Sequence, residues 1–172
     1  MKFKFDANQG YQLDAIQAAA DLFKGQQESR SSYEISFRSE TVLFGQSTVQ
    51  TDLGLGNALS IGDLALQENL SLVQKRNGIL DRTELQKQGK NFAIEMETGS
   101  GKTYVYLRTL FELNKVYGYK KFIIVVPSIA IREGVLKSIA ITREHFSELY
   151  NNVPVDSFVY DSKRAANLRS FA

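Results

Sequence analysis

Apolar residues recur every three or four positions along four stretches of the chain, which is the spacing of an amphipathic helix. The first stretch is bounded by Asn8, a candidate N-cap, and by Gly25, and the third ends before Gly118. In the fourth, Thr142 is expected to break the helix and to start a second piece. The predicted helices cover residues 8–24, 60 or 63 to 76, 104–117 and 129–149.

Other stretches have the pattern of strands. Residues 122–126, Phe-Ile-Ile-Val-Val, are continuously apolar and mostly β-branched, which is typical of a strand buried on both faces of a parallel sheet. Residues 91–96 and 155–160 are two more predicted strands, and predicted helices separate the three. This alternation favours an α/β fold with right-handed crossovers, in which helices cover both faces of a parallel sheet.

Residues 25–88 do not follow this alternation. Residues 33–38 and 41–44 predict a hairpin, a stretch with three glycines follows, and the second predicted helix comes next. The acidic residues of this region are spread singly and form no catalytic constellation. We therefore interpret residues 25–88 as a segment, or lid, inserted before the strand at residues 91–96.

That strand and the helix at residues 104–117 are joined by the turn Glu-Thr-Gly-Ser-Gly-Lys-Thr, residues 97–103. Strand, glycine-rich turn, Gly-Lys-Thr and helix form the layout of the phosphate-binding loop of P-loop NTPases. The glycines let the backbone approach a phosphate, and the free amides at the helix start attract an anion. Lys102 supplies a charge for the β- and γ-phosphates, and the Thr103 hydroxyl is placed to bind Mg²⁺. We predict Lys102 and Thr103 as catalytic residues in a nucleotide site made of Thr98, Gly99, Ser100, Gly101, Lys102 and Thr103.

One position departs from the full P-loop pattern. Met96 stands where the pattern has its first glycine, five residues before Gly101. Many helicase-type ATPases lack that glycine and have Thr-Gly-x-Gly-Lys-Thr, which is the wording here. The alternative is a glycine-rich turn with a chance Lys-Thr pair, which the flanking strand and helix patterns disfavour.

Composition and charge exclude several other functions. With 172 residues, 43% of them apolar, the chain is long enough to bury a core. A net charge of +2 gives no strong basic field, so any binding of nucleic acid has to be local. One histidine and no cysteine exclude a Cys/His zinc site, a disulfide framework and a thiol nucleophile. No signal peptide and no run of about 18 apolar residues occurs, so we expect a cytoplasmic protein without a membrane partner.

Two further features accompany the P-loop. In a parallel sheet the ligand binds at the carboxyl ends of the strands, so residues 127–128, which follow the strand at 122–126, predict a second functional loop beside the nucleotide. Gln12 lies in the first predicted helix, and its amide can pair with N6 and N7 of adenine at once. Taken alone, a solvated helical glutamine is the better interpretation of Gln12.

Three separated segments together resemble one family. Residues 11–16, Tyr-Gln-Leu-Asp-Ala-Ile, look like the Q motif of superfamily-two helicases, residues 94–106 look like motif I, and residues 125–135 look like motif Ia. Met-Glu-Thr-Gly-Ser-Gly-Lys-Thr-Tyr and Pro-Ser-Ile-Ala-Ile-Arg-Glu-Gly-Val resemble in particular the restriction (Res) subunit of type III restriction-modification enzymes. This resemblance implies a RecA-like fold, ATP and Mg²⁺ as cofactors, and Gln12 as the adenine contact. It also implies that Ser128 and Arg132 contact the DNA backbone, the alternatives being an N-cap serine and a solvated arginine.

The resemblance implies an activity and partners as well. The full enzyme of this family would use ATP to move or switch on double-stranded DNA and cut it, alongside a modification methyltransferase (Mod) subunit in the bacterial cytoplasm. No Asp-Glu pair occurs in the sequence, so motif II, which holds Mg²⁺ and orients the attacking water, is missing. We therefore interpret residues 1–172 as the N-terminal part of a first RecA-like domain and expect it not to hydrolyse ATP by itself. The alternatives are another superfamily-two helicase, a type I restriction subunit or, against the evidence of Gln12 and Arg132, a P-loop small-molecule kinase.

Overall fold

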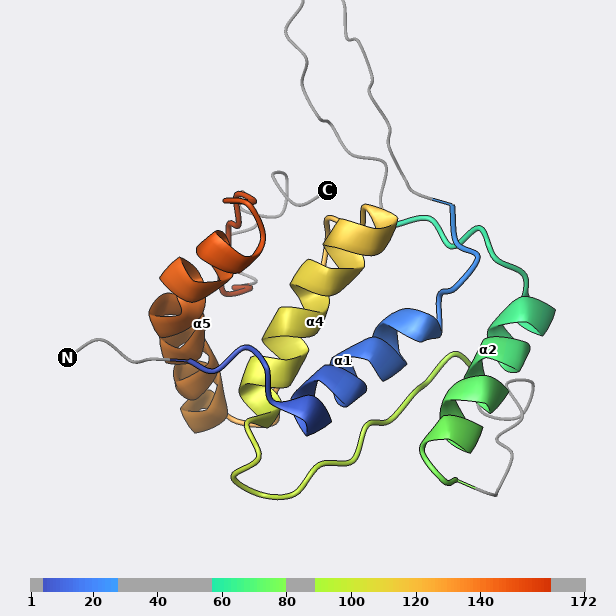
Figure 1. Cartoon of the computed structure of the whole chain (residues 1–172). Coiled ribbons are helices and arrows are strands. Elements are labelled where there is room, and N and C mark those ends of the chain that lie inside the picture. The colour runs from blue at the N-terminus through green and yellow to red at the C-terminus, as the bar shows by residue number, and fades with distance from the viewer. Residues whose placement is uncertain (1–4, 28–56, 80–88, 162–172) are drawn as a thin grey trace, which may run out of the picture.

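The computed structural model describes residues 5–27, 57–79 and 89–161, and four helices lie in these ranges (Figure 1). They are α1 (Gly10–Asp21), α2 (Asp63–Arg76), α4 (Lys102–Tyr117) and α5 (Ile129–Leu149). Helix α1 packs against α4, while α5 lies on the other flank of α4 and α2 lies beyond α1 (Figure 1). The predicted hairpin at residues 33–38 and 41–44 lies outside the described residues.

All four helices were predicted, but two of their details were wrong. Helix α1 has Gln9 as its N-cap instead of Asn8, because the Asn8 N–H donates to the Asp6 carboxylate at 2.9 Å in a separate turn. Helix α5 is continuous across Thr142, whose hydroxyl donates to the Ser138 carbonyl at 2.7 Å. A threonine that bonds one turn back is accommodated inside a helix and does not end it.

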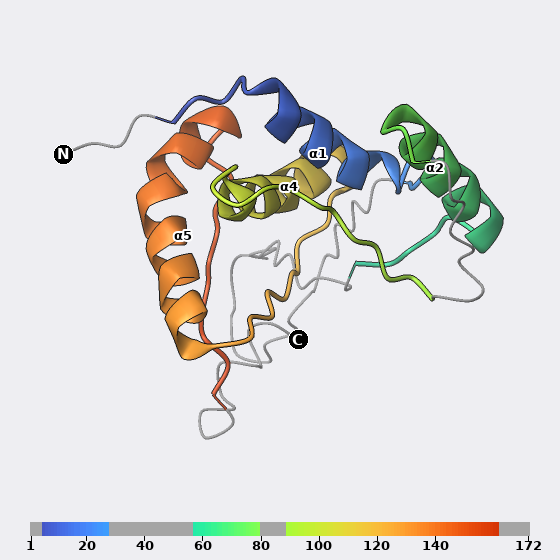
Figure 2. The same ribbon diagram turned by 90° about the horizontal axis from the view of Figure 1, so that it is seen from below.

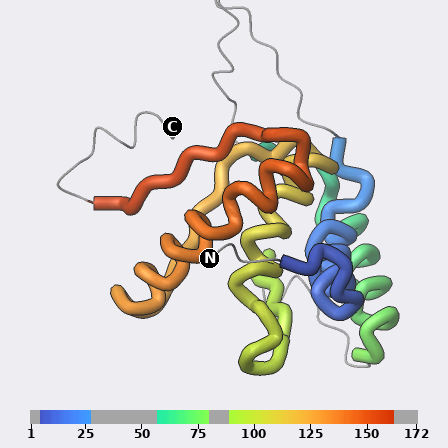
Figure 3. The backbone as a smooth tube through the Cα atoms, turned by 60° about the vertical axis from the view of Figure 1, so that its left-hand side comes forward, coloured from blue at the N-terminus to red at the C-terminus, as the bar shows by residue number. Residues whose placement is uncertain are grey.

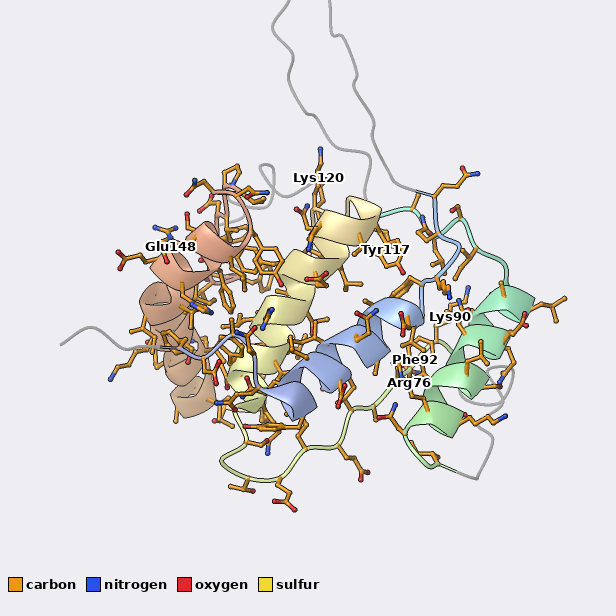
Figure 4. All side chains as sticks on the ribbon, viewed as in Figure 1. Arg76, Lys90, Phe92, Tyr117, Lys120 and Glu148 are labelled. Atoms are coloured by element: carbon orange, nitrogen blue, oxygen red, sulfur yellow. The ribbon has the colours of Figure 1, made fainter. Side chains whose placement is uncertain are left out.

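Two apolar clusters hold the helices together. The first joins α1 to α2 and consists of Leu22, Leu66 and Leu70, with Phe23, Ile61 and Phe92 packed against it. The second joins α4 to α5 around Leu107, Phe146 and Tyr150. Figure 4 shows Phe92, Arg76 and Lys90 at the junction of α1 and α2. Arg76 pairs there with Asp21 at 2.6 Å, and Lys90 pairs with Asp63 at 2.8 Å.

Of the predicted insertion, residues 25–88, the structure describes residues 25–27 and 57–79, and hydrogen bonds join these two parts. The Gln26 side chain accepts from the Ser60 N–H at 2.8 Å and donates to the Ala58 carbonyl at 2.9 Å, so it bonds to the backbone as a neighbouring strand would. Residues 57–79, with α2, then pack on the end of α1. This half of the region is a packed part of the protein at its flank, beside the core made by α1, α4 and α5.

The predicted parallel sheet is not confirmed. Residues 91–96, 121–126 and 155–160 form neither helix nor strand, and no strand occurs within the described ranges. Ile123 is 78% exposed and Val125 is 87% exposed, although their pattern predicts burial on both faces. A strand requires a ladder of hydrogen bonds to a neighbour about 4.8 Å away, and these segments lack one in the structure. Figure 2 shows the segments after α4 and α5 running on the side of α4 opposite α1, which is where such a sheet would lie.

Candidate functional site

The glycine-rich turn before α4 protrudes from the body of the molecule (Figure 3). Gly99 has a φ of 84° and Gly101 a φ of 87°, in the left-handed region that a residue with a Cβ enters only with strain. Gly101 is the N-cap of α4 and has no side-chain cap. The first amides of α4 therefore face the turn without a capping side chain, which is the arrangement that attracts an anion.

Lys102 is folded back over this turn. Its Nζ donates to the Met96 carbonyl at 3.0 Å and to the Glu97 carbonyl at 2.8 Å. The Glu97 carbonyl also accepts from Ser100, whose hydroxyl lies at 2.6 Å and whose N–H lies at 3.3 Å. Lys102 is exposed, and a phosphate that enters the turn would compete with two neutral carbonyls for its ammonium group. A bond between an ammonium group and an anion is stronger than one between an ammonium group and a neutral carbonyl.

Thr103 and Thr98 flank the lysine, the first partly buried in the opening turn of α4 and the second exposed. Within residues 5–27, 57–79 and 89–161, no group of three His, Cys, Asp or Glu side chains could hold a metal ion. The role of the Thr103 hydroxyl as a ligand of Mg²⁺ stays a prediction.

Gln12 reaches the turn from α1 although 88 positions separate it from Ser100. Its side chain is buried, and Nε2 donates to the Ser100 carbonyl at 3.0 Å and lies 3.4 Å from the Tyr11 hydroxyl. A Cβ at Gly101 would lie 2.6 Å from this nitrogen, so the amide of Gln12 occupies the space beside that glycine. The structure thus brings Gln12 and the P-loop together. Nε2 already donates to the Ser100 carbonyl and lies near the Tyr11 hydroxyl. Gln12 can therefore bind a base without losing these contacts only through Oε1, which is an acceptor.

Ser128 and Arg132 lie at the start of α5. Ser128 is the N-cap, and its Oγ accepts from the Ile131 N–H at 3.3 Å. Arg132 pairs with Glu133 at 3.0 Å, and both side chains are exposed. The cap leaves the Ser128 hydroxyl proton free to be donated, and an exposed pair such as Arg132 with Glu133 contributes at most about 1 kcal/mol. The contacts of Ser128 and Arg132 with DNA stay a prediction.

A buried polar network between α4 and α5 was not predicted from the sequence. Arg108 donates to the Ala7 carbonyl at 2.6 Å and to the Tyr150 hydroxyl at 3.2 Å. Tyr150 in turn donates to the Glu112 carboxylate at 2.8 Å, and burial raises the pKa of Tyr150 to about 12. The signal available in the sequence was an arginine three residues after Val105, on the buried side of the helix.

Residues 9–167 match the sequence model of a family described as "Type III restriction enzyme, res subunit". The chain belongs to this family. Membership implies a P-loop, helicase-like fold, and the family predicted from the three motifs is confirmed. No helix in the part of the chain that the structure describes is long and apolar enough to span a bilayer.

Three curated relatives are all Res subunits of type III restriction-modification enzymes. The chain is 30% identical to EcoPI Res of Escherichia phage P1 over 168 residues, which are 95% of this chain and 16% of the relative. It is 37% identical to EcoP15I Res of Escherichia coli over 119 residues, covering 66% and 12% of the two chains. With StyLTI Res of Salmonella typhimurium it shares 47% identity over 68 residues, covering 38% and 7%. The chain thus spans a small fraction of the length of each of these relatives.

Proposed function

We propose that this chain is the ATP-binding part of the Res subunit of a type III restriction endonuclease, in which ATP hydrolysis is coupled to DNA cleavage by the full-length enzyme. The observation that carries the proposal is the docking of Gln12 on the turn that holds Lys102 and Thr103. Many ATPases have a phosphate-binding turn, but here an amide suited to a purine edge lies directly beside it. Family membership supports the same function.

In this proposal each group of the site has a separate task. The amides of the turn and of the first turn of α4 hold the phosphates, and Thr98, Gly99, Ser100 and Gly101 supply the backbone that does so. Lys102 leaves the carbonyls of Met96 and Glu97 and neutralises the β- and γ-phosphates. The Thr103 hydroxyl would hold Mg²⁺, which would supply positive charge against the phosphates.

Gln12 confers a preference for adenine. Its Oε1 accepts from the N6 amino group, whereas guanine presents the O6 acceptor at that position. Turning the amide round to suit guanine would remove the bond from Nε2 to Ser100, so the docked geometry opposes adaptation. Ser128 and Arg132 serve double-stranded DNA instead, through contacts with the phosphate backbone next to a Mod subunit that reads the site.

The nucleotide part is tested with a fluorescent ATP analogue and this chain. Lys102→Ala is expected to weaken binding about tenfold or more, because a hydrogen bond to a charged group contributes about 1.5–3 kcal/mol. Lys75→Ala, which removes an exposed lysine from α2, serves as the matched control and should have no effect. Competition with ATP and GTP should show a preference for ATP that Gln12→Ala removes. Equal loss in both lysine variants would contradict the assignment.

The DNA part is tested in the full-length enzyme by measuring DNA affinity against salt concentration. Arg132→Ala is expected to weaken binding of all sequences alike and to reduce the salt slope by about one, since one phosphate contact is lost. ATP affinity should be nearly unchanged. Lys75→Ala removes the same charge elsewhere and should leave the slope intact. A variant of Arg132 that lost ATP binding and kept the salt slope would refute the DNA role.

A further inference from the structure

A hydrogen bond joins the first turn of α4 to the C-terminal part of α5. The Tyr104 hydroxyl and the His145 Nε2 lie 2.8 Å apart. Tyr104 directly follows Thr103, so this bond is made one residue beyond the proposed phosphate and Mg²⁺ ligands. His145 is the one histidine in the sequence, which makes its protonation state measurable as a single signal.

Aromatic rings enclose this bond. Phe5, from the segment before α1, has its ring centroid 6.0 Å from that of Tyr104 and 5.3 Å from that of His145. Phe146 also packs against Tyr104, with ring centroids 5.2 Å apart. Three segments thus meet around one hydroxyl, and their packing limits where Tyr104 can point. The bond is part-buried, and a hydrogen bond away from water is electrostatically stronger than a fully exposed one.

The charges around the pair favour its neutral form. Burial lowers the pKa of His145 below its usual 6.5, and Arg108 on α4 acts in the same direction, while Glu148 on α5 opposes them. Glu148 lies on α5 (Figure 4), the same helix as His145. At neutral pH the Tyr104 hydroxyl therefore shares its hydrogen bond with an uncharged imidazole, and the tautomer of His145 sets which of the two groups donates.

We propose that the Tyr104–His145 hydrogen bond is a positioning contact, which fixes the first turn of α4 and so the backbone of the nucleotide site against α5. The inference rests on the proposed nucleotide function. Lys102 and Thr103 stand in the same helical turn as Tyr104, so a tilt of that turn moves the amides and the hydroxyl that face the phosphates. His145 acts through Tyr104 and touches no phosphate.

The test compares Tyr104→Phe with Tyr106→Phe. Tyr106 lies on the same helix and packs on the same cluster, but its hydroxyl makes no hydrogen bond within the described residues. At pH 7.5, Tyr104→Phe should weaken binding of the fluorescent ATP analogue about fivefold, the factor that matches one ordinary hydrogen bond. Tyr106→Phe should bind as the wild type does. Equal affinities for all three proteins would overturn the proposal, whatever their stabilities.

The pH dependence identifies His145 as the partner. Protonation leaves His145 Nε2 able only to donate, and it adds a charge to the bond with the Tyr104 oxygen. The ratio of the wild-type affinity to that of Tyr104→Phe should therefore change between pH 7.5 and pH 5, with its midpoint at the His145 pKa measured by NMR. Taking the ratio cancels the titration of the ATP phosphates themselves, which occurs in the same range. A ratio that stays constant would overturn the assignment of His145.

A nucleotide-independent measurement separates this inference from the proposed function. If the wild-type chain binds no ATP, the proposed function fails, and the NMR amide signals of Lys102 and Thr103 then decide. Displacement of these signals in Tyr104→Phe but not in Tyr106→Phe supports the positioning contact. Unchanged signals in both variants refute it.

Discussion

Replacing Gly101 by alanine is expected to destabilise the protein through two separable effects. The residue has a φ of 87°, and an alanine in the left-handed region costs about 1–2 kcal/mol. The new Cβ would also lie 2.6 Å from Gln12 Nε2. Because that nitrogen is the tip of a flexible side chain, it can move away, and its lost bond to Ser100 costs about 1 kcal/mol more. We expect a total decrease in unfolding free energy of about 2–3 kcal/mol.

The measurement is urea unfolding followed by far-ultraviolet circular dichroism, with Gly99→Ala as the matched control. Gly99 has a φ of 84° and no atom within 4 Å of an added Cβ, so its substitution carries only the backbone strain of about 1–2 kcal/mol. The difference between the two alanine variants isolates the contact with Gln12. Introducing Gln12→Ala into the wild type and into Gly101→Ala completes a double-mutant cycle. In the Gly101→Ala background, Gln12→Ala should have almost no effect on stability, because the amide is already displaced.

Two results together would refute this reasoning. One is an equal loss of stability in Gly99→Ala and Gly101→Ala. The other is an unchanged effect of Gln12→Ala in the Gly101→Ala background, which would give a coupling energy of zero. In that case the added methyl group would have left the bond from Gln12 to Ser100 in place.

Three further predictions concern stability. Gly134→Ala should stabilise the protein by about 0.5–1 kcal/mol in urea unfolding, because Gly134 is exposed within α5 and an added Cβ meets no atom within 4 Å; a loss of stability would contradict this. Asn69→Ala should cost about 1–2 kcal/mol, because Asn69 donates to the carbonyls of Leu22 and Lys24 at 3.0 Å and 2.8 Å after the end of α1, whereas Glu68→Ala on the same helix should be nearly neutral. The unfolding free energy should be constant above pH 6.5 and should fall as the pH drops from 6.5 to the lower pKa that His145 has in the folded protein, because the unfolded chain binds the proton first. The variant His145→Gln should not show this decrease. If the decrease persists in that variant, His145 is not its cause.

The helices of this protein could be predicted because their signals are local. Apolar periodicity with Asp63 at one end and Gly118 at another marked α2 and α4 almost to the residue. The errors at Asn8 and Thr142 share one cause. In each case a short-range bond between a side chain and the backbone competed with the expected boundary, and the sequence alone does not say which of two nearby partners wins.

Some residues of the candidate site could be predicted from the sequence, whereas others could be found only in the structure. Its phosphate-binding turn is a run of consecutive residues, so the glycines and Lys102 could be recognised in the sequence. The resemblance to a helicase motif indicated Gln12, but only the structure showed the amide docked on the Ser100 carbonyl. Nothing in the sequence indicated the bond between Tyr104 and His145, because 41 positions separate them and their meeting depends on how α4 and α5 pack.

The predicted sheet could not be established from the sequence. Composition made residues 122–126 a predicted strand, since β-branched apolar residues suit a pleated, buried environment. In the structure this run is exposed at Ile123 and Val125 and has no ladder, so the sheet stays a prediction. The physical reason is that a helix satisfies its own backbone hydrogen bonds within one segment, whereas a strand depends on a neighbour that its own residues do not specify.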